Sequence, residues 1–93
     1  MRDSDESRMT DLLLPQIAAG EPSAVERFLS RYSSMVWGLA RRICRTPEDA
    51  EDATQEIFVE VWHSAHRYDP RIGSEVTFLM TIARRRLIDR ARR

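Results

Sequence analysis

The 93-residue sequence contains no lysine, so arginine supplies all fifteen of its basic residues. Arginine offers planar contacts that match phosphate, but a GC-rich genome would also favour its codons, so only the placement of the arginines bears on function. Glycine is scarce as well. Its three residues stand alone, and the chain therefore has no glycine-rich loop that could hold the phosphates of a nucleotide.

Cysteine and histidine are also rare. The single Cys44 excludes a disulfide within the chain, and its place among apolar residues at helical spacing predicts a small core side chain. His63 and His66 lie three apart, but no third ligand follows at metal-site spacing, so we expect neither a metal nor another cofactor. Nothing suggests a pocket that would desolvate the carboxylates for acid–base catalysis, so we expect no enzyme.

Long apolar runs are missing too. None approaches the roughly 18 residues of a membrane span, and the acidic, polar start does not resemble a signal peptide. These features predict a cytoplasmic protein. The length suits one domain, which we expect over residues 10–93, after a disordered tail at residues 1–9.

The charges are sorted into blocks, although their sum is zero. Residues 1–26 carry two arginines and six acidic residues, whereas residues 27–45 carry five arginines and no acid. Residues 46–62 carry six acids and no base, and residues 63–93 carry eight arginines and three acids. The clustering of the charges, rather than their sum, is therefore the feature that bears on function.

No segment alternates with the period of a strand, and the apolar spacing predicts an all-α fold, a small bundle of four helices whose three long members surround one core. The helices are expected at about 11–19, 22–45, 47–64 and 75–92. Thr46 and Ser74 are predicted N-caps, and Gly20 a C-terminal cap; Pro15 leaves the start of the first helix open. The side chains expected to face the core are Val25, Phe28, Leu29, Tyr32, Val36, Leu39, Ala40, Ile43, Ala50, Ala53, Ile57, Phe58, Val61, Trp62, Val76, Leu79, Ile82, Ala83 and Leu87.

The acidic third helix has two interpretations. Charge runs on amphipathic helices are usually solvated faces. This strip, however, has no basic residue at i,i+4 to offset its own repulsion, and it includes the hydrogen-bonding pair Gln55-Glu56. A docking surface for a basic protein partner is therefore the sharper hypothesis.

The basic end is open to two interpretations as well. Arginines at the end of a helix stabilise its dipole, but residues 84–93 hold more of them than capping needs. Tyr68 and Phe78 lie just upstream, and arginines that follow phosphates combined with aromatics that stack on bases are what single-strand binding requires. Trp62 continues the apolar stripe, so we interpret it as a core residue.

Four motifs in order give the chain a family resemblance. Residues 49–58, DAEDATQEIF, resemble the D-A-E-D-x-x-Q-E-x-F signature in conserved region two of extracytoplasmic-function (ECF) sigma factors. Residues 82–93 are similar to the family's I-A-R-x-x-x-I-D-x-x-R-R stretch, and residues 67–74 to its R-F-D-P-x-x-G-S loop. The Ala-Gly-Glu start of residues 19–32 also fits. The resemblance covers about residues 10–93.

The resemblance implies a transcription initiation factor with two partners. In that family the acidic helix docks on the arginine-rich clamp helices of the RNA polymerase β′ subunit, which implies contacts from Asp52, Gln55 and Glu56, with Asp49 peripheral. The loop and last helix engage the non-template single strand of the promoter −10 element and trap a flipped base. The residues implied there are Arg67, Tyr68, Arg71, Ser74, Phe78, Arg84, Arg85 and Arg90. An anti-sigma factor is an expected partner, covering the same acidic helix.

The chain departs from the family pattern in two respects. Phe78 stands where many relatives have tryptophan, and Glu75 replaces an aromatic with an acid that we expect near the DNA path, where it would repel phosphate. The expected second domain, a helix-turn-helix that reads the −35 element, is also missing, so we expect a piece of a longer protein.

Two other function classes remain open. A free-standing helix-turn-helix regulator of double-stranded DNA needs a recognition helix after a short turn, whereas a long loop precedes the basic helix here. A helical module that binds only proteins would use both charged faces without nucleic acid. A preference for single-stranded over duplex DNA distinguishes the transcription initiation factor from these two classes.

Overall fold

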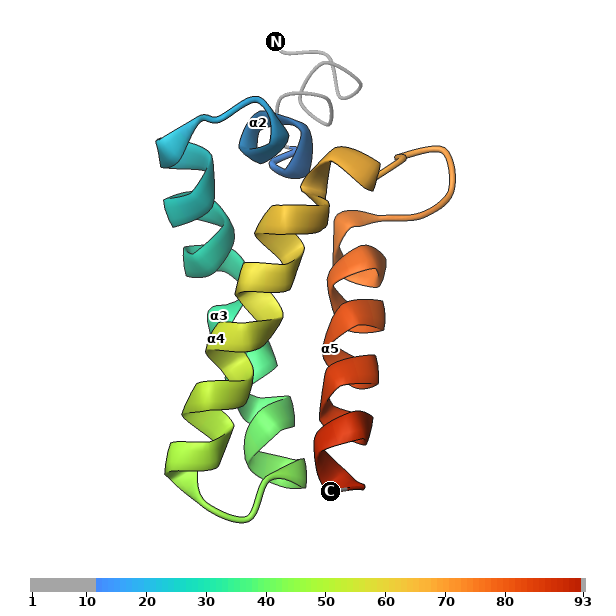
Figure 1. Ribbon diagram of the computed structural model, residues 1–93. Coiled ribbons are helices and arrows are strands. Elements are labelled where there is room, and N and C mark those ends of the chain that lie inside the picture. Colours follow the sequence, from blue (N-terminus) through green and yellow to red (C-terminus); the bar gives the residue numbers. More distant parts are fainter. Residues whose placement is uncertain (1–11, 93) are drawn as a thin grey trace, which may run out of the picture.

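The computed structural model describes residues 12–92, and all regular structure in that range is helical, which confirms the all-α prediction (Figure 1). The elements are α2 (Leu14–Ala18), α3 (Pro22–Ile43), α4 (Pro47–Ser64), the short 3-10 helix η1 (Ala65–Arg67) and α5 (Glu75–Ala91). The expected tail at residues 1–9 lies outside the described residues. The bundle is elongated, with principal extents of 48 × 22 × 22 Å.

Local capping sets the helix boundaries where the sequence predicts them. The Thr46 hydroxyl accepts a hydrogen bond from the Asp49 amide at 3.0 Å, and Ser74 accepts one from the Thr77 amide at 3.1 Å. Gly20 ends α2 with a φ of 89°, a conformation that favours glycine. The first helix is shorter than expected. It begins at Leu14, which places Pro15 in the first turn, where a missing amide proton is tolerated.

One core joins all the helices, and Phe28 of α3 is fully buried within it. Its ring meets Tyr32 edge-on, with centroids 4.7 Å apart, and meets Trp62 at 5.5 Å. Trp62 packs against the core, as predicted. The other buried apolar residues are Leu13, Leu14, Ile17, Ala24, Val36, Ala40, Ala50, Ala53, Ile57, Phe58, Val61, Ala65, Leu79, Ile82, Ala83 and Leu87.

The prediction for Ile43 was wrong. As the last residue of α3 it is 38% exposed, because the backbone turns into an extended conformation at the next residue, Cys44. Cys44 itself packs against the core, as expected, and this burial raises the pKa of its thiol. The last residue of the apolar stripe on α3 thus lies beyond the helix contacts that bury the other residues of the stripe.

Helix α4 lies between its two long neighbours in the bundle. It packs on α3 and on α5, and α5 runs alongside it for most of its length (Figure 1). One side of α4 is therefore committed to α3, another faces α5, and a third is open to solvent. The acidic residues of this helix fall on the last two sides.

Candidate functional site

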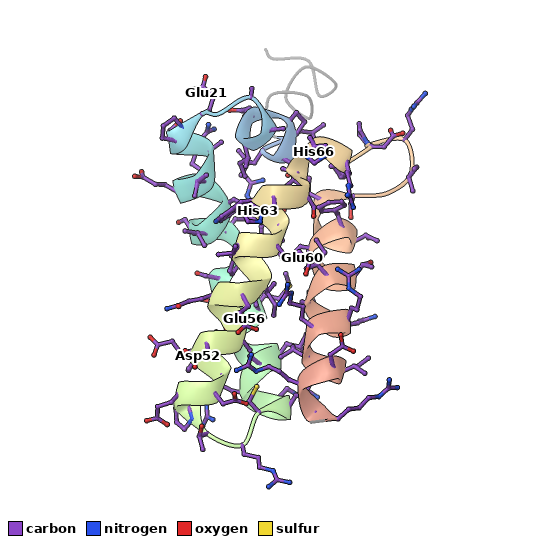
Figure 2. The ribbon with its side chains drawn as sticks, viewed as in Figure 1. Glu21, Asp52, Glu56, Glu60, His63 and His66 are labelled. Atoms are coloured by element: carbon purple, nitrogen blue, oxygen red, sulfur yellow. The ribbon has the colours of Figure 1, made fainter. Side chains whose placement is uncertain are left out.

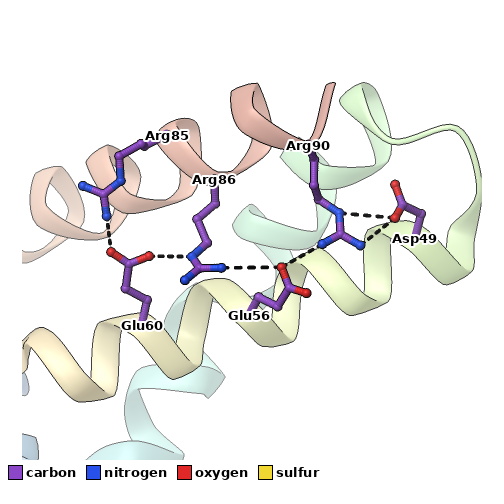
Figure 3. A network of polar contacts seen from close by, with 6 residues as sticks. All are labelled: Asp49, Glu56, Glu60, Arg85, Arg86 and Arg90. Carbon is purple, nitrogen blue, oxygen red and sulfur yellow. Dashed lines mark hydrogen bonds and ion pairs between the residues drawn. The ribbon is translucent and has the colours of Figure 1, made fainter. Parts of the chain in front are cut away.

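Ion pairs cross the space between α4 and α5 (Figure 3). The end of this array at the right of Figure 3 is built around Arg90 of α5. Its Nη2 and Nε donate to Asp49 Oδ1 at 2.6 and 3.2 Å, and its Nη1 donates to Glu56 Oε1 at 2.7 Å. The Arg90 side chain is only 15% exposed, so the guanidinium is held firmly between two carboxylates.

Two further arginines extend the array along α5. Arg86 Nε donates to Glu60 Oε1 at 2.5 Å, and its Nη1 lies 3.6 Å from Glu56 Oε1. Arg85 pairs with the other oxygen of Glu60. Figure 2 shows Glu60 between the two helices. We call these six residues the ladder: Asp49, Glu56, Glu60, Arg85, Arg86 and Arg90.

The ladder corrects one premise of the sequence argument. The acidic strip has no basic partner within its own helix, but three of its carboxylates find partners across the bundle. Hydrogen bonding to Arg90 lowers the pKa of Asp49, and the same bond raises the pKa of Arg90. Asp49, Glu56, Arg85 and Arg90, all predicted to touch partners, are thus engaged with one another in the free chain.

The solvent-facing side of α4 carries the two predicted polymerase contacts that do not belong to the ladder, Asp52 and Gln55. The side chains of Asp52 and Gln55 are exposed and form no hydrogen bond with any residue in the 12–92 range. They line a shallow hollow with Glu56, Val59 and Arg86, which we call the acidic hollow. Val59 is 48% exposed and was missed by the sequence argument, although its position off the apolar stripe could have revealed it.

The loop between η1 and α5 is shaped by its own hydrogen bonds. The Tyr68 hydroxyl donates to the Gly73 carbonyl at 3.0 Å and so closes the loop. Asp69 accepts from the backbone and from the guanidinium of Arg71, and these bonds lower the pKa of its carboxyl. Tyr68 and Phe78 meet edge-on at 5.6 Å, and both are half-buried against the core.

A second hollow lies beside this loop. Three of the predicted nucleic-acid residues, Arg67, Phe78 and Arg85, line it. Its other lining residues, which sequence reasoning did not identify, are Glu60, Ser64, Ile72, Thr77, Thr81 and Ile82. Ile72 is 85% exposed, so an apolar side chain projects from the loop. We call this the loop hollow. It offers apolar and aromatic surface bordered by guanidinium groups.

The remaining predicted residues do not line the loop hollow. Tyr68 supports Phe78 from the side, and Arg71 is exposed but paired with Asp69. Ser74 is occupied as the N-cap of α5. Arg84 is exposed on α5. Arg90 lies at the far end of the ladder, so the structure does not bring it to the loop.

Glu75 is not in the DNA-facing position that the sequence suggested. It is only 5% exposed, and its Oε2 accepts a hydrogen bond of 2.5 Å from the Leu14 amide. The first amides of a helix lack partners within the helix, and this carboxylate from the start of α5 supplies one for α2. Burial raises the pKa of Glu75, opposed by hydrogen bonds from the Leu14 and Leu13 amides.

This burial gives a pH-dependent prediction for Glu75→Gln. Because the folded pKa is raised, the contribution of Glu75 to stability is complete below the ordinary glutamate pKa and declines as the pH rises through the folded pKa. A glutamine keeps an acceptor without the charge, so the variant should gain stability relative to the wild type between pH 4.5 and pH 7. Urea unfolding at both pH values measures this difference. A stability difference between variant and wild type that is the same at both pH values would contradict this prediction.

Two further features of residues 12–92 concern metal ligands and apolar helices. No three metal-binding side chains lie close enough together there to hold an ion, and His63 and His66 are both exposed. No helix in this range is long and apolar enough to cross a membrane.

Comparison with known proteins identifies the family. The family model of Sigma-70 region 2 matches residues 28–93, more than half of the sequence, and the chain therefore belongs to this family. This match confirms the resemblance found in the sequence motifs.

Among the similar proteins are ECF RNA polymerase sigma factors named SigK. The chain is 42% identical over 82 residues to that of Mycobacterium sp. (strain KMS), covering 88% of the chain and 42% of the relative. It is 44% identical over 80 residues to that of Mycobacterium ulcerans (strain Agy99), covering 86% and 43%. The match to Mycobacterium tuberculosis (strain ATCC 25177 / H37Ra) is 39% over 82 residues, covering 88% and 44%. The chain thus spans less than half the length of these relatives.

Proposed function

We propose that this chain is a transcription initiation module that joins RNA polymerase to an opened promoter strand without catalysing a reaction itself. The observation that carries the proposal is the separation of two exposed surfaces of different chemistry. The acidic hollow presents Asp52 and Gln55 on α4, whereas the loop hollow presents Phe78 bordered by Arg67 and Arg85. Family membership and the names of the SigK relatives support the same function.

The acidic hollow fits an arginine-rich helical partner, which we propose to be the β′ clamp helices. The carboxylate of Asp52 and the amide of Gln55 are both exposed, and guanidinium groups bind such acceptors with directional hydrogen bonds. Val59 adds an apolar contact beside them. Glu56 completes the contact set, and Asp49 stays peripheral because it lies at the far end of the ladder. An anti-sigma factor would compete for the same surface.

The loop hollow fits an unpaired base, which we propose to belong to the non-template strand of the −10 element. Flipping a base out of the stack costs a few kcal/mol, which stacking and edge hydrogen bonds must return. Phe78 supplies a ring face, with Tyr68 bracing it edge-on. Thr77 and Thr81 supply hydroxyls, and Arg67 and Arg85 supply charge for neighbouring phosphates. In this proposal Arg71, Ser74, Arg84 and Arg90 follow the strand on either side.

A strand-preference titration tests the proposal. The chain should bind a fluorescent single strand more tightly than the matching duplex, and log K should fall with log salt by roughly 0.7 per phosphate neutralised. Phe78→Ala should weaken single-strand binding about tenfold, because stacking contributes about 1–3 kcal/mol per base.

The control for that titration is Trp37→Ala, which removes a 39% exposed aromatic from α3, away from the loop hollow. It should change the affinity less than twofold. Thermal melting verifies that both variants are folded at the temperature of the titration. Equal affinity of the wild type for single strand and duplex would contradict the proposal and favour a double-strand regulator.

A further inference from the structure

A single side-chain bond closes the loop that joins η1 to α5. Residues 68–74 leave the bundle after η1 and return to it at the start of α5 (Figure 1). The Tyr68 hydroxyl donates to the Gly73 carbonyl, five positions further along, at 3.0 Å. Among the described residues it is the only side-chain hydrogen bond between the first and the last part of this loop. The R-F-D-P motif that the chain resembles has phenylalanine at this position, so a relative that follows the motif lacks the hydroxyl that forms the bond.

The tip of the loop is ordered by contacts between near neighbours. The Ile72 amide donates to the Asp69 carbonyl at 3.0 Å and closes a four-residue turn, with Pro70 at the second position, where proline is favoured. The Asp69 carboxylate also accepts from the Arg71 amide at 2.9 Å. These contacts shape the tip but do not fix its distance from α5. The bond from Tyr68 therefore determines where the tip lies relative to α5.

Tyr68 is anchored firmly enough to hold the loop. Its ring packs against the core and meets Phe78 edge-on, with centroids 5.6 Å apart. Burial raises the pKa of the Tyr68 hydroxyl, and the nearby Glu75 carboxylate raises it further. The hydroxyl therefore keeps its proton at neutral pH and stays a hydrogen-bond donor.

We propose that Tyr68 is a positioning residue, whose hydroxyl holds the loop in its strand-binding shape before a strand arrives. The proposal rests on the function proposed above and deepens it, because it assigns the hydroxyl to the loop and not to a base. With the bond in place, Ile72 at the loop tip and Phe78 on α5 both line the loop hollow. A strand that meets a site already in its bound shape does not have to offset the lost freedom of the loop, and it binds more tightly as a result.

The expected size of the effect follows from an equilibrium between open and closed loops. One net hydrogen bond shifts such an equilibrium by about fivefold. The apparent affinity for the strand, however, falls only in proportion to the fraction of closed loops. Where loops without the bond are mostly open, loss of the hydroxyl should therefore lower the strand affinity about threefold.

Tyr68→Phe tests the role, because it removes the hydroxyl and keeps the ring beside Phe78. The variant should bind a fluorescent single strand about threefold more weakly than the wild type. The slope of log K against log salt should stay the same, because no phosphate contact is lost. Hydrogen exchange of the Ile72 amide should become faster at an unchanged melting temperature, because the loop opens while the bundle stays folded. A residue that only stabilised the bundle would lower the melting temperature instead.

Tyr32→Phe is the matched control. It removes the same group from another tyrosine that packs against the core, and the Tyr32 hydroxyl forms no hydrogen bond with any residue in the 12–92 range. We expect the strand affinity and the exchange of the Ile72 amide to stay almost unchanged. Equal losses of affinity in Tyr32→Phe and Tyr68→Phe would overturn the proposal, because they would not depend on the loop bond.

A second change distinguishes positioning from direct contact between the hydroxyl and the strand. The φ of Gly73 is not positive, and a Cβ there would meet the Thr77 side chain at an ordinary 3.6 Å. Alanine at such a position reduces the freedom of the open loop. Adding Gly73→Ala to Tyr68→Phe should therefore restore part of the lost affinity. A loss that Gly73→Ala does not reduce, with Ile72 exchange as in the wild type, would assign the hydroxyl to the strand and overturn the positioning role.

The behaviour of the wild type distinguishes a failure of this proposal from a failure of the proposed function. If the wild type prefers the single strand and Tyr68→Phe binds it equally well, the positioning role is wrong while the proposed function stands. If the wild type binds single strand and duplex equally, the proposed function fails, and the positioning role fails with it.

Discussion

The double change Asp52→Arg with Gln55→Ala is expected to weaken binding to the β′ clamp helices at least hundredfold. The arginine places a like charge against an arginine-rich partner, and a like-charge contact in an interface costs several kcal/mol. The alanine removes an exposed amide from the acidic hollow. Anisotropy titration of a labelled clamp-helix fragment measures the loss. Unchanged affinity would remove the acidic hollow from the proposed interface.

Glu26→Arg is the control for this experiment. It makes the same reversal of charge at an exposed position on α3, remote in sequence from the acidic hollow. Its net charge equals that of the Asp52→Arg variant, so a purely long-range effect would weaken binding equally in both. We expect a change of less than threefold for Glu26→Arg, larger at low salt than at high salt because exposed charges are screened.

Phe28→Ala is expected to remove a large part of the stability of the chain. Phe28 is fully buried and meets three aromatic rings, those of Tyr32, Phe58 and Trp62. Truncation of a buried phenylalanine costs about 3–5 kcal/mol, and a domain has only about 5–15 kcal/mol of stability in total. The melting temperature should fall by roughly 12 °C or more, since each kcal/mol shifts it by about 4–8 °C in a domain of this size.

Phe28→Leu distinguishes the contribution of buried apolar volume to stability from that of the aromatic ring contacts. Leucine retains most of the apolar volume and loses the edge-on contacts, so we expect a loss of about 1–2 kcal/mol, clearly smaller than that of the alanine variant. Circular dichroism melting compares the two. Similar losses in both variants would mean that the ring contacts, rather than the buried volume, determine the stability at this position.

The sequence predicted the features that depend on neighbouring residues. Thr46 and Ser74 act as N-caps as expected, because a cap is a contact over three residues. The buried stripes of α4 and α5 followed from helical spacing. Ile43, the last residue of α3, was an exception, since the apolar stripe continued in sequence to the point where the helix ends.

Contacts between distant residues could not be read from the sequence. Arg90 meets Asp49 across 41 positions, and Glu75 reaches Leu14 across 61. Both depend on how the helices are packed side by side, which spacing within one helix does not specify. The sequence therefore placed Glu75 by its neighbours near the loop, whereas the packing of α2 against the start of α5 buries it.

The ladder also restricts which substitutions the chain can accumulate during evolution. Glu60 accepts from both Arg85 and Arg86, so losing its charge by a single mutation leaves Arg85 without its carboxylate and Arg86 with only its 3.6 Å contact to Glu56. A change at position 60 is therefore tolerated best when 85 or 86 changes with it. Descendants of this chain would alter α4 and α5 in pairs, so neither of the two proposed surfaces would change on its own.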